Sequence, residues 1–280
     1  NRFAGWYPLL VRVFPGSGFH TRCSYMGFSD VTKFLAECGP AVVMGANRSA
    51  GDHVATLANW TAASTPAFSD SAVMPMVIEA YTTDRASAPS AMLVGDSRFA
   101  SPPLAESATA YRTLATKIEQ AALAGGVKLK LVRAAQGGKT GPVYTQRASK
   151  TLDGGIQPNV SVYLGYSIND GSPTDATLAA AKARVLAHVT QCRKGGIIPV
   201  IISIFPTGTG GFPSAMPRVN DFEAFCAGLG APCLSPLVIY GNASTGAWTG
   251  AWAEDANHMT PAGYTDLAAR IWALVAPLLR

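Results

Sequence analysis

Strand-like apolar runs alternate with helix-like segments from about residue 90 to the end of the chain, and no other feature constrains the fold as strongly. Such alternation is typical of a parallel sheet with helices on its faces. Strands are expected at 91–94, 127–132, 160–164, 197–204 and 233–237, and helices at 102–124, 174–194, 219–229 and 261–278. The sequence predicts a three-layer α/β/α fold, in which ligands bind beyond the carboxyl ends of the strands.

Residues 1–88 follow a different pattern. Gly, Pro, Ser and Thr interrupt short apolar pieces such as 9–14 and 41–44, which is typical of short strands and irregular loops. We therefore expect a small β-rich amino-terminal module at 1–88 and an α/β domain at 89–280.

The composition narrows the classes of function. The 280 residues carry a net charge of +5, yet only 14% of them are charged and no run of Lys and Arg occurs. Nucleic acid is therefore not expected as a partner, because its recognition relies on clustered basic side chains. The basic balance suits an acidic polysaccharide, although a merely basic surface explains it equally well. Apolar stretches fall short of the about 20 residues of a membrane helix, so no membrane span is expected.

The cysteine usage is ambiguous because the count is odd, whereas the glycosylation sequons favour a secreted protein. The five cysteines allow at most two disulfides; Cys23 with Cys38 and Cys226 with Cys233 are the sequence-near pairs, and Cys192 is expected as a buried free thiol. Asn-x-Ser/Thr sequons occur at residues 47, 59, 159 and 242, and they matter in a secretory route. The chain begins without an apolar leader, which we interpret as a mature or trimmed form.

Two short motifs carry the residues of a nucleophilic serine site. Gly95-Asp96-Ser97 directly follows the first predicted strand, and Asp255-Ala256-Asn257-His258 precedes the last predicted helix. A serine hydroxyl is a weak nucleophile at neutral pH, so an enzyme that uses it needs an imidazole base and a carboxylate that orients the imidazole. Each motif alone is weak, because such residues are common in turns and caps. Together they predict a triad of Ser97, His258 and Asp255.

These motifs resemble those of the SGNH hydrolases, also called the GDSL family of esterases and lipases, over about residues 90–280. The first and last blocks of that family are matched by the two motifs above, and Thr260-Pro261-Ala262-Gly263-Tyr264 follows as in many members. The second block is matched by Gly138-Lys139-Thr140, and the third in part by Asn169-Asp170. The resemblance implies a flavodoxin-like SGNH fold with a five-stranded parallel sheet, and a serine esterase activity.

The resemblance also implies a role for each matched residue. Ser97, Asp255 and His258 would be catalytic. The backbone N–H groups of Ser97 and Gly138 and the side-chain amide of Asn169 would form an oxyanion hole, which stabilises the negative charge of the tetrahedral intermediate.

Two positions depart from the family pattern. Ser167 stands where the third block has glycine, and Gly165 lies two positions too early, so we expect a longer or bulged loop and an altered pose of Asn169. Arg133 stands where the second block often opens with asparagine. Neither change removes a catalytic atom.

Other residues near these motifs have less specific interpretations. Arg98, beside the nucleophile, and Trp248 and Trp252 are expected to bind substrate, with core packing as the equal alternative for both tryptophans. His188 is expected to be a surface or packing residue, and Asp170 to order its loop or cap a helix. No spacing of Cys, His and carboxylates indicates a metal site, and the expected chemistry needs no cofactor.

The expected function is hydrolysis of a small acyl ester through an acyl-enzyme, with an O-acetylated carbohydrate as substrate. The expectation of an acetyl group as the acyl part rests on the breadth of the family and on the basic character and the expected extracellular location of the chain. A short-chain lipid or aryl esterase is the alternative within the same chemistry, and acyl transfer to a sugar is a third. A non-catalytic carbohydrate-binding protein that retains the fold is the alternative from another class.

Overall fold

The computed structural model describes residues 89–101, 113–208 and 210–279. The expected β-rich module at 1–88 lies outside the described residues. The same is true of residues 102–112, which form the first half of the first expected helix.

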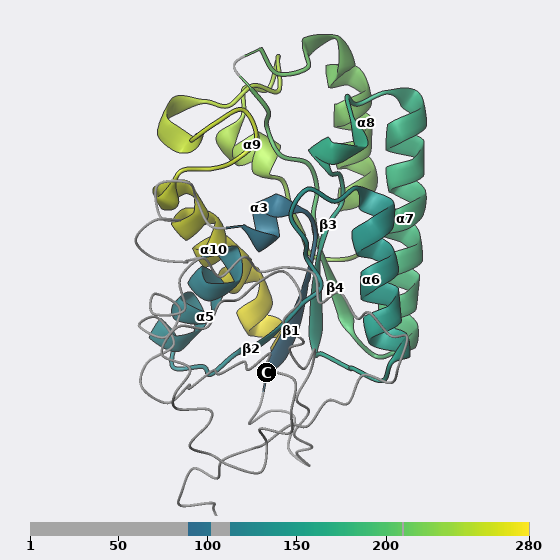
Figure 1. The fold of residues 1–280 in the computed structure, drawn as a ribbon, viewed down its shortest axis with the longest axis vertical. Helices are drawn as coiled ribbons and strands as arrows, with labels where there is room; N and C mark the ends of the chain where they lie inside the picture. The colour runs from purple at the N-terminus through teal and green to yellow at the C-terminus, as the bar shows by residue number, and fades with distance from the viewer. Residues whose placement is uncertain (1–88, 102–112, 209, 280) are drawn as a thin grey trace, which may run out of the picture. The chain divides into compact units, whose positions relative to one another are not determined.

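A five-stranded parallel sheet forms the centre of this part of the chain (Figure 1). The strand order is β2-β1-β3-β4-β5, so the chain enters the sheet at β1, next to one edge, forms the edge strand β2, and then crosses β1 to build the sheet toward the other edge. Neighbouring strands pair in parallel throughout. The strands are β1 (Ser90–Val94), β2 (Lys130–Arg133), β3 (Val160–Leu164), β4 (Ile198–Ile202) and β5 (Cys233–Leu234).

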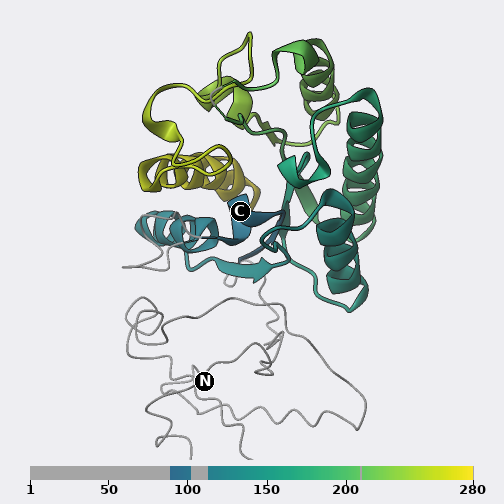
Figure 2. The ribbon, with the colours of Figure 1, turned by 45° about the horizontal axis from the view of Figure 1, so that its top comes forward.

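Helices cover both faces of the sheet, which confirms the predicted three-layer α/β/α arrangement (Figures 1 and 2). One face carries α5 (Leu114–Ala124) and α10 (Pro261–Val275). The other face carries α6 (Gly141–Asp153), α7 (Asp175–Lys194) and α8 (Met216–Ala227). Short elements fill the connections: α3 (Ser97–Ala100), α9 (Pro236–Tyr240), and 3-10 turns at Ile168–Asp170, Pro213–Ala215, Gly250–Trp252 and Ala276–Leu279.

The two cores follow from the alternation of side chains along buried strands. On β1, Ala91 and Leu93 pack against α5 and α10, whereas Met92 and Val94 face α6, α7 and α8. Because both faces are covered, β1 and β3 are apolar along nearly their whole length, as expected for parallel strands. A site at this sheet must therefore lie beyond the strand ends.

Several elements differ from the sequence prediction. Helix α6 was not predicted, because its buried face consists only of Gly141, Tyr144 and Ala148 and most of its other residues are polar. The strand expected at 127–132 occupies Lys130–Arg133. The strand expected at 233–237 ends at Leu234, and Pro236 starts a short helix instead, as suits proline at a first helical turn.

Three cysteines of the described residues are free thiols. The sequence-near pair Cys226 and Cys233 is therefore unbridged. Cys226 lies on the buried face of α8, and Cys233 lies on the edge strand β5. Cys192 is buried and free, whereas Cys23 and Cys38 lie outside the described residues. None of the described helices is both long enough and apolar enough to cross a bilayer.

Candidate active site

Ser97 lies at the carboxyl end of β1, on the first turn of α3. Gly95 lets the backbone between β1 and Ser97 pass close to β3 and to Phe99. A Cβ at this position would stand 3.1 Å from Leu164 Cβ on β3 and from the Phe99 ring. Asp96 caps the short helix, and its Oδ1 accepts a hydrogen bond from the backbone N–H of Arg98 at 2.9 Å. The tight turn holds the Ser97 hydroxyl beyond the strand end.

The structure brings the three residues of the predicted triad into one hydrogen-bonded chain. Ser97 Oγ lies 2.9 Å from His258 Nε2, and His258 Nδ1 lies 2.9 Å from Asp255 Oδ2. The serine and the histidine are 161 residues apart in sequence. With the proton on Nδ1, where it is donated to the Asp255 carboxylate, Nε2 is free to accept the serine proton, which is the arrangement that a general base requires.

The Asp255 carboxylate also shapes the loop that carries the histidine. Its Oδ1 accepts hydrogen bonds from the backbone N–H groups of Asn257 at 2.6 Å and His258 at 2.7 Å. Partial burial opposes ionisation, but the hydrogen bonds from the His258 ring and from these amides prevail and lower the pKa of Asp255 below its ordinary value. The carboxylate is therefore ionised at neutral pH.

Hydrogen bonds from residues outside this loop also hold it in place, through the backbone carbonyl of Ala256. This oxygen accepts from Gly208 N at 2.6 Å, from Trp248 Nε1 at 3.1 Å and from Thr207 Oγ1 at 3.2 Å. The triad itself is open to solvent, since the His258 side chain is 25% exposed and that of Asp255 is 38% exposed. A substrate therefore reaches the histidine without a rearrangement of the described residues.

The expected oxyanion donors lie on three loops at the strand ends. Within the described residues, the backbone N–H groups of Ser97 and Gly138 have no hydrogen-bond acceptor. Gly138 has a φ of 66°, which favours glycine, and the loop passes close to the serine because a Cβ on Gly137 would lie 3.9 Å from Ser97 Cβ.

Asn169 is oriented by its neighbours. Its Nδ2 donates to the Lys139 carbonyl at 3.1 Å, which leaves the second N–H of the amide unused. Ser167 caps the turn at Ile168–Asp170, and its Oγ accepts from Asn169 N at 3.2 Å. The hydroxyl of Ser167, which stands where the family pattern has glycine, therefore supports the loop that carries Asn169.

Asp170 orders the neighbouring loop, as expected. Its Oδ1 accepts from the backbone N–H of Gly141 at 2.8 Å, at the start of α6, and its Oδ2 is paired with Arg184 on α7. The half-buried pair locks α6 and α7 to the loop that presents Asn169.

Arg98 does not have the expected substrate-binding position. Its side chain is 1% exposed, packs over the Phe205 ring and donates from Nε to the Asn257 carbonyl at 2.9 Å. The turn at Asp96 directs the side chain inward, behind the serine. Substrate contact by Arg98 is therefore a wrong expectation, and a position next to a nucleophile could not by itself reveal the direction of the side chain.

Trp248 and Trp252 are half-buried and pack against the core cluster of α5 and α10. The Trp252 ring meets Tyr240 edge-on at 5.3 Å, and Trp248 holds the Ala256 carbonyl. Both tryptophans thus have packing contacts, and Trp248 also supports the histidine loop.

His188 is a packing residue and does not lie on the surface. It is 2% exposed, stacks on Tyr163 at 4.3 Å and has its Nε2 2.9 Å from Ser161 Oγ. Burial lowers the pKa of His188 to about 4.

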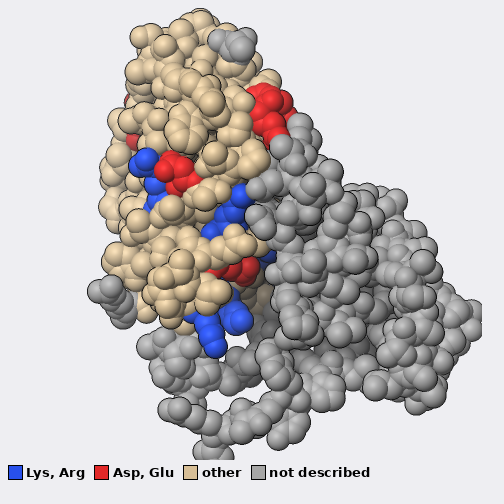
Figure 3. Space-filling view, turned by 90° about the vertical axis from the view of Figure 1, so that its left-hand side faces the viewer, with Lys and Arg blue, Asp and Glu red and all other residues tan. Residues whose placement is uncertain are grey.

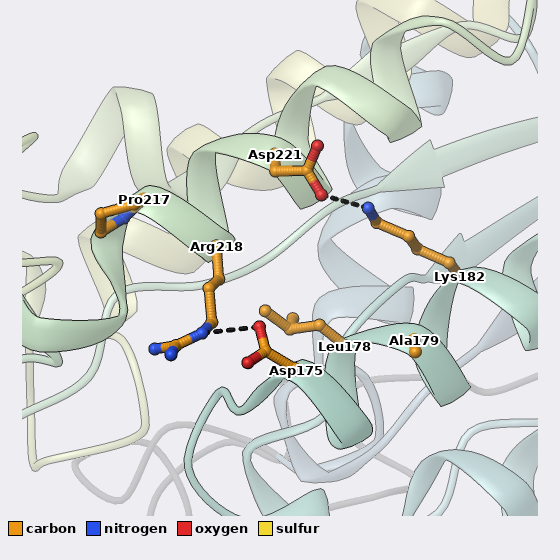
Figure 4. A pocket seen from close by; sticks show the side chains of 7 residues that line it. All are labelled: Asp175, Leu178, Ala179, Lys182, Pro217, Arg218 and Asp221. Carbon is orange, nitrogen blue, oxygen red and sulfur yellow. Dashed lines mark hydrogen bonds and ion pairs between the residues drawn. The ribbon is translucent and has the colours of Figure 1, made fainter.

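A surface pocket of about 360 Å³ lies between α7 and α8 and contains none of the residues discussed above as site residues (Figure 4). Ion pairs of Asp175 with Arg218 and of Lys182 with Asp221 bridge the two helices across it. Among the described residues, no group of three or more His, Cys, Asp or Glu side chains is arranged to hold a metal ion. On the side that carries α5 and α10, Lys and Arg lie among Asp and Glu, and most of the visible described surface is uncharged (Figure 3).

Comparison with solved structures identifies the fold. A candidate acylhydrolase from Bacteroides fragilis superposes with a TM-score of 0.51 and 16% sequence identity, covering 69% of this chain and 91% of its own. The lipase/acylhydrolase from Enterococcus faecalis gives 0.50 and 16%, covering 68% of this chain and 96% of its own. The described domain shares the three-layer α/β/α fold of these two acylhydrolases, as the resemblance to the SGNH hydrolases implied. A search of family descriptions and of curated proteins finds no match to the sequence. At these identities the likeness concerns the fold alone.

Within this fold, the supporting roles of two residues near the site were not predicted from the sequence. Thr207 holds the histidine loop from the β4 side, and Ser167 bridges the loops of the expected oxyanion hole. A polar residue three positions after the end of a predicted strand was the available signal for both, but it did not specify the partner.

Proposed function

We propose that the protein is a carboxylic ester hydrolase of the SGNH type, in which Ser97 is the nucleophile. The observation that carries this proposal is the continuous chain Ser97 Oγ, His258 Nε2, His258 Nδ1 and Asp255 Oδ2, with 2.9 Å at both contacts. A hydrogen bond between a serine and a histidine does not by itself indicate catalysis, since the buried pair of Ser161 and His188 makes the same contact in this protein. Solvent access and the orienting carboxylate distinguish the pair formed by Ser97 and His258.

The reaction would proceed in two halves. Ser97 Oγ attacks the ester carbonyl while His258 Nε2 takes its proton, and the tetrahedral intermediate collapses when His258 returns the proton to the leaving alcohol. Water then attacks the acyl-serine with the same base, which releases the acid. Asp255 holds the ring in the required tautomer and stabilises the imidazolium.

The negative charge on the carbonyl oxygen would be met by three donors. These are the backbone N–H groups of Ser97 and Gly138 and the unused side-chain N–H of Asn169. Two of these donors lack an acceptor among the described residues, and the third is oriented by the Lys139 carbonyl. Preorganised donors of this kind are each worth about 3 kcal/mol in the transition state.

The substrate class we propose is an O-acetylated carbohydrate. Exposure of His258 and Asp255 supports a bulky, polymeric leaving group, because the base lies at an open surface. The net charge of +5 favours an acidic polymer. The sequons support action outside the cell, which is part of the proposal.

The decisive experiment is hydrolysis of p-nitrophenyl acetate by the parent protein and by Ser97→Ala, with Ser161→Ala as the matched serine control. The parent and Ser161→Ala should turn over the ester, and Ser97→Ala should lose at least about a thousandfold of the activity. Activity of Ser97→Ala within tenfold of the parent would refute the nucleophile.

Two further assays separate the alternatives. A fluorophosphonate probe should label Ser97, as read by mass spectrometry of the peptide, whereas a non-catalytic fold would remain unlabelled. Release of acetate from acetylated xylan, pectin, sialic acid and peptidoglycan, set against butyrate from tributyrin, distinguishes a carbohydrate esterase from a lipid esterase. Faster cleavage of tributyrin than of every sugar ester would overturn the substrate class and leave the nucleophile in place.

A further inference from the structure

Arg98 joins the two halves of the candidate active site. It directly follows Ser97 on α3, and its Nε donates to the backbone carbonyl of Asn257 at 2.9 Å. Asn257 directly precedes His258. One side chain, 1% exposed, therefore connects the helix of the nucleophile to the loop of the base across 159 residues of sequence.

The surroundings of the Arg98 guanidinium are costly for a charge. Its central carbon lies 5.0 Å from the centre of the Phe205 ring, and its Nη2 is buried without an acceptor among the described residues. Burial lowers the pKa of Arg98, while the carboxylates of Asp96 and Asp255 oppose this change. An apolar side chain of similar volume would fill such a space at lower cost. Packing alone therefore does not explain an arginine here.

The other bonds of the loop come from a different direction. Thr207, Gly208 and Trp248 hold the Ala256 carbonyl, and none of them belongs to α3. Between α3 and the loop of residues 254–258, the described residues make two hydrogen bonds, one from Arg98 to Asn257 and one between Ser97 and His258. Among the described residues, the Arg98 bond is thus the direct hydrogen bond between α3 and this loop that involves no reacting atom.

We propose that Arg98 is a positioning residue, which holds His258 at hydrogen-bonding distance from Ser97 through the Asn257 carbonyl. The inference rests on the proposed function. Loss of the bond would let the histidine loop move away from α3, and a displacement of about 1 Å can slow a reaction about 100-fold. Substrate binding would be unchanged, because the guanidinium is buried behind the serine.

The test compares Arg98→Met, which keeps the volume but removes the charge and the donor, with Arg98→Lys, which retains both. Arg193→Met is the matched control, because Arg193 also donates to backbone carbonyls, those of Leu229 and Gly230, away from the site. For each protein we would measure kcat and KM for p-nitrophenyl acetate, and both the rate constant and the final stoichiometry of fluorophosphonate labelling.

Arg98→Met should lower kcat by about 100-fold with KM within threefold of the parent, and should slow labelling by a similar factor while the final stoichiometry stays near one. Arg98→Lys should recover most of both rates, and Arg193→Met should match the parent. A reduced stoichiometry with an unchanged rate constant for the labelled fraction would mean a folding role and would overturn the proposal. So would a parental rate in Arg98→Met. A parent protein that cannot be labelled would instead refute the proposed function.

Discussion

Ser167 Oγ donates a hydrogen bond to Asp96 Oδ2 at 2.7 Å, and both side chains are fully buried. Asp96 precedes the candidate nucleophile, and the same hydroxyl accepts from Asn169 N and lies 3.3 Å from the Lys139 carbonyl. The residue at the position where the resemblance expects glycine therefore joins the three loops that would supply the oxyanion donors. The serine that departs from the family pattern thus adds a side-chain hydrogen bond to Asp96 that glycine could not make.

Removal of this hydroxyl should affect both stability and turnover. Ser167→Ala leaves a buried carboxylate oxygen without its partner, which should lower the free energy of unfolding by about 1–3 kcal/mol. Loosening of Asn169 should also lower kcat. Ser203→Ala is the control, since Ser203 donates a hydrogen bond of the same length, 2.7 Å, to the partly buried carboxylate of Glu223. Chemical denaturation and ester kinetics would measure both; an equal loss of kcat in the two variants would contradict the specific role of Ser167.

Asp255→Asn should preserve the conformation of the loop at 254–258 but prevent His258 from acting as a general base. The amide can present its N–H to His258 Nδ1, which favours the tautomer with the proton on Nε2, so kcat should fall by about 10⁴ with little change in KM. Asp266→Asn, which changes a carboxylate of α10 paired with Tyr240 and Arg270, should leave kcat unchanged. Steady-state kinetics test this, and retention of more than a tenth of the parental kcat would show that the carboxylate does not orient the ring.

Asn169→Ala should remove one donor to the developing oxyanion. The expected loss in kcat is about 100-fold to 1,000-fold, with KM nearly unchanged, because the interaction strengthens only in the transition state. Asn242→Ala, in an exposed turn, is the control. If kcat falls by less than threefold, Asn169 does not face the oxyanion.

Buried His188 should make the protein less stable in acid. Its pKa of about 4 lies below the ordinary 6.5, so between these values the unfolded chain binds a proton that the folded protein does not. Stability is therefore fully present above pH 6.5 and decreases as the pH falls, by about 2–3 kcal/mol at pH 4.5. His188→Gln should lack this part of the decrease. Denaturant titrations at pH 7.5 and 4.5 would compare the two, and equal decreases would contradict the assignment.

Local patterns were sufficient for most of the described α/β architecture. The strand at Val160–Leu164 and the helix at Asp175–Lys194 agree with prediction to within one residue, because a continuous apolar run and a capped, glycine-terminated helix are encoded by adjacent residues. Helix α6 was missed because it buries few side chains, so its register depends on packing against β1 and α7. The predicted module at 1–88 stays a prediction.

The sequence by itself determined which side chains can perform acyl chemistry and that Ser97 and Asn169 follow strands whose carboxyl ends meet at one edge. Only the tertiary structure decided their partners: that His258 reaches Ser97, that Arg98 turns inward to Asn257, and that Ser167 binds Asp96. The physical reason is that strand and helix formation depends on neighbours along the chain, whereas a hydrogen bond between residues 71 to 161 positions apart depends on how whole loops are placed by the packed sheet.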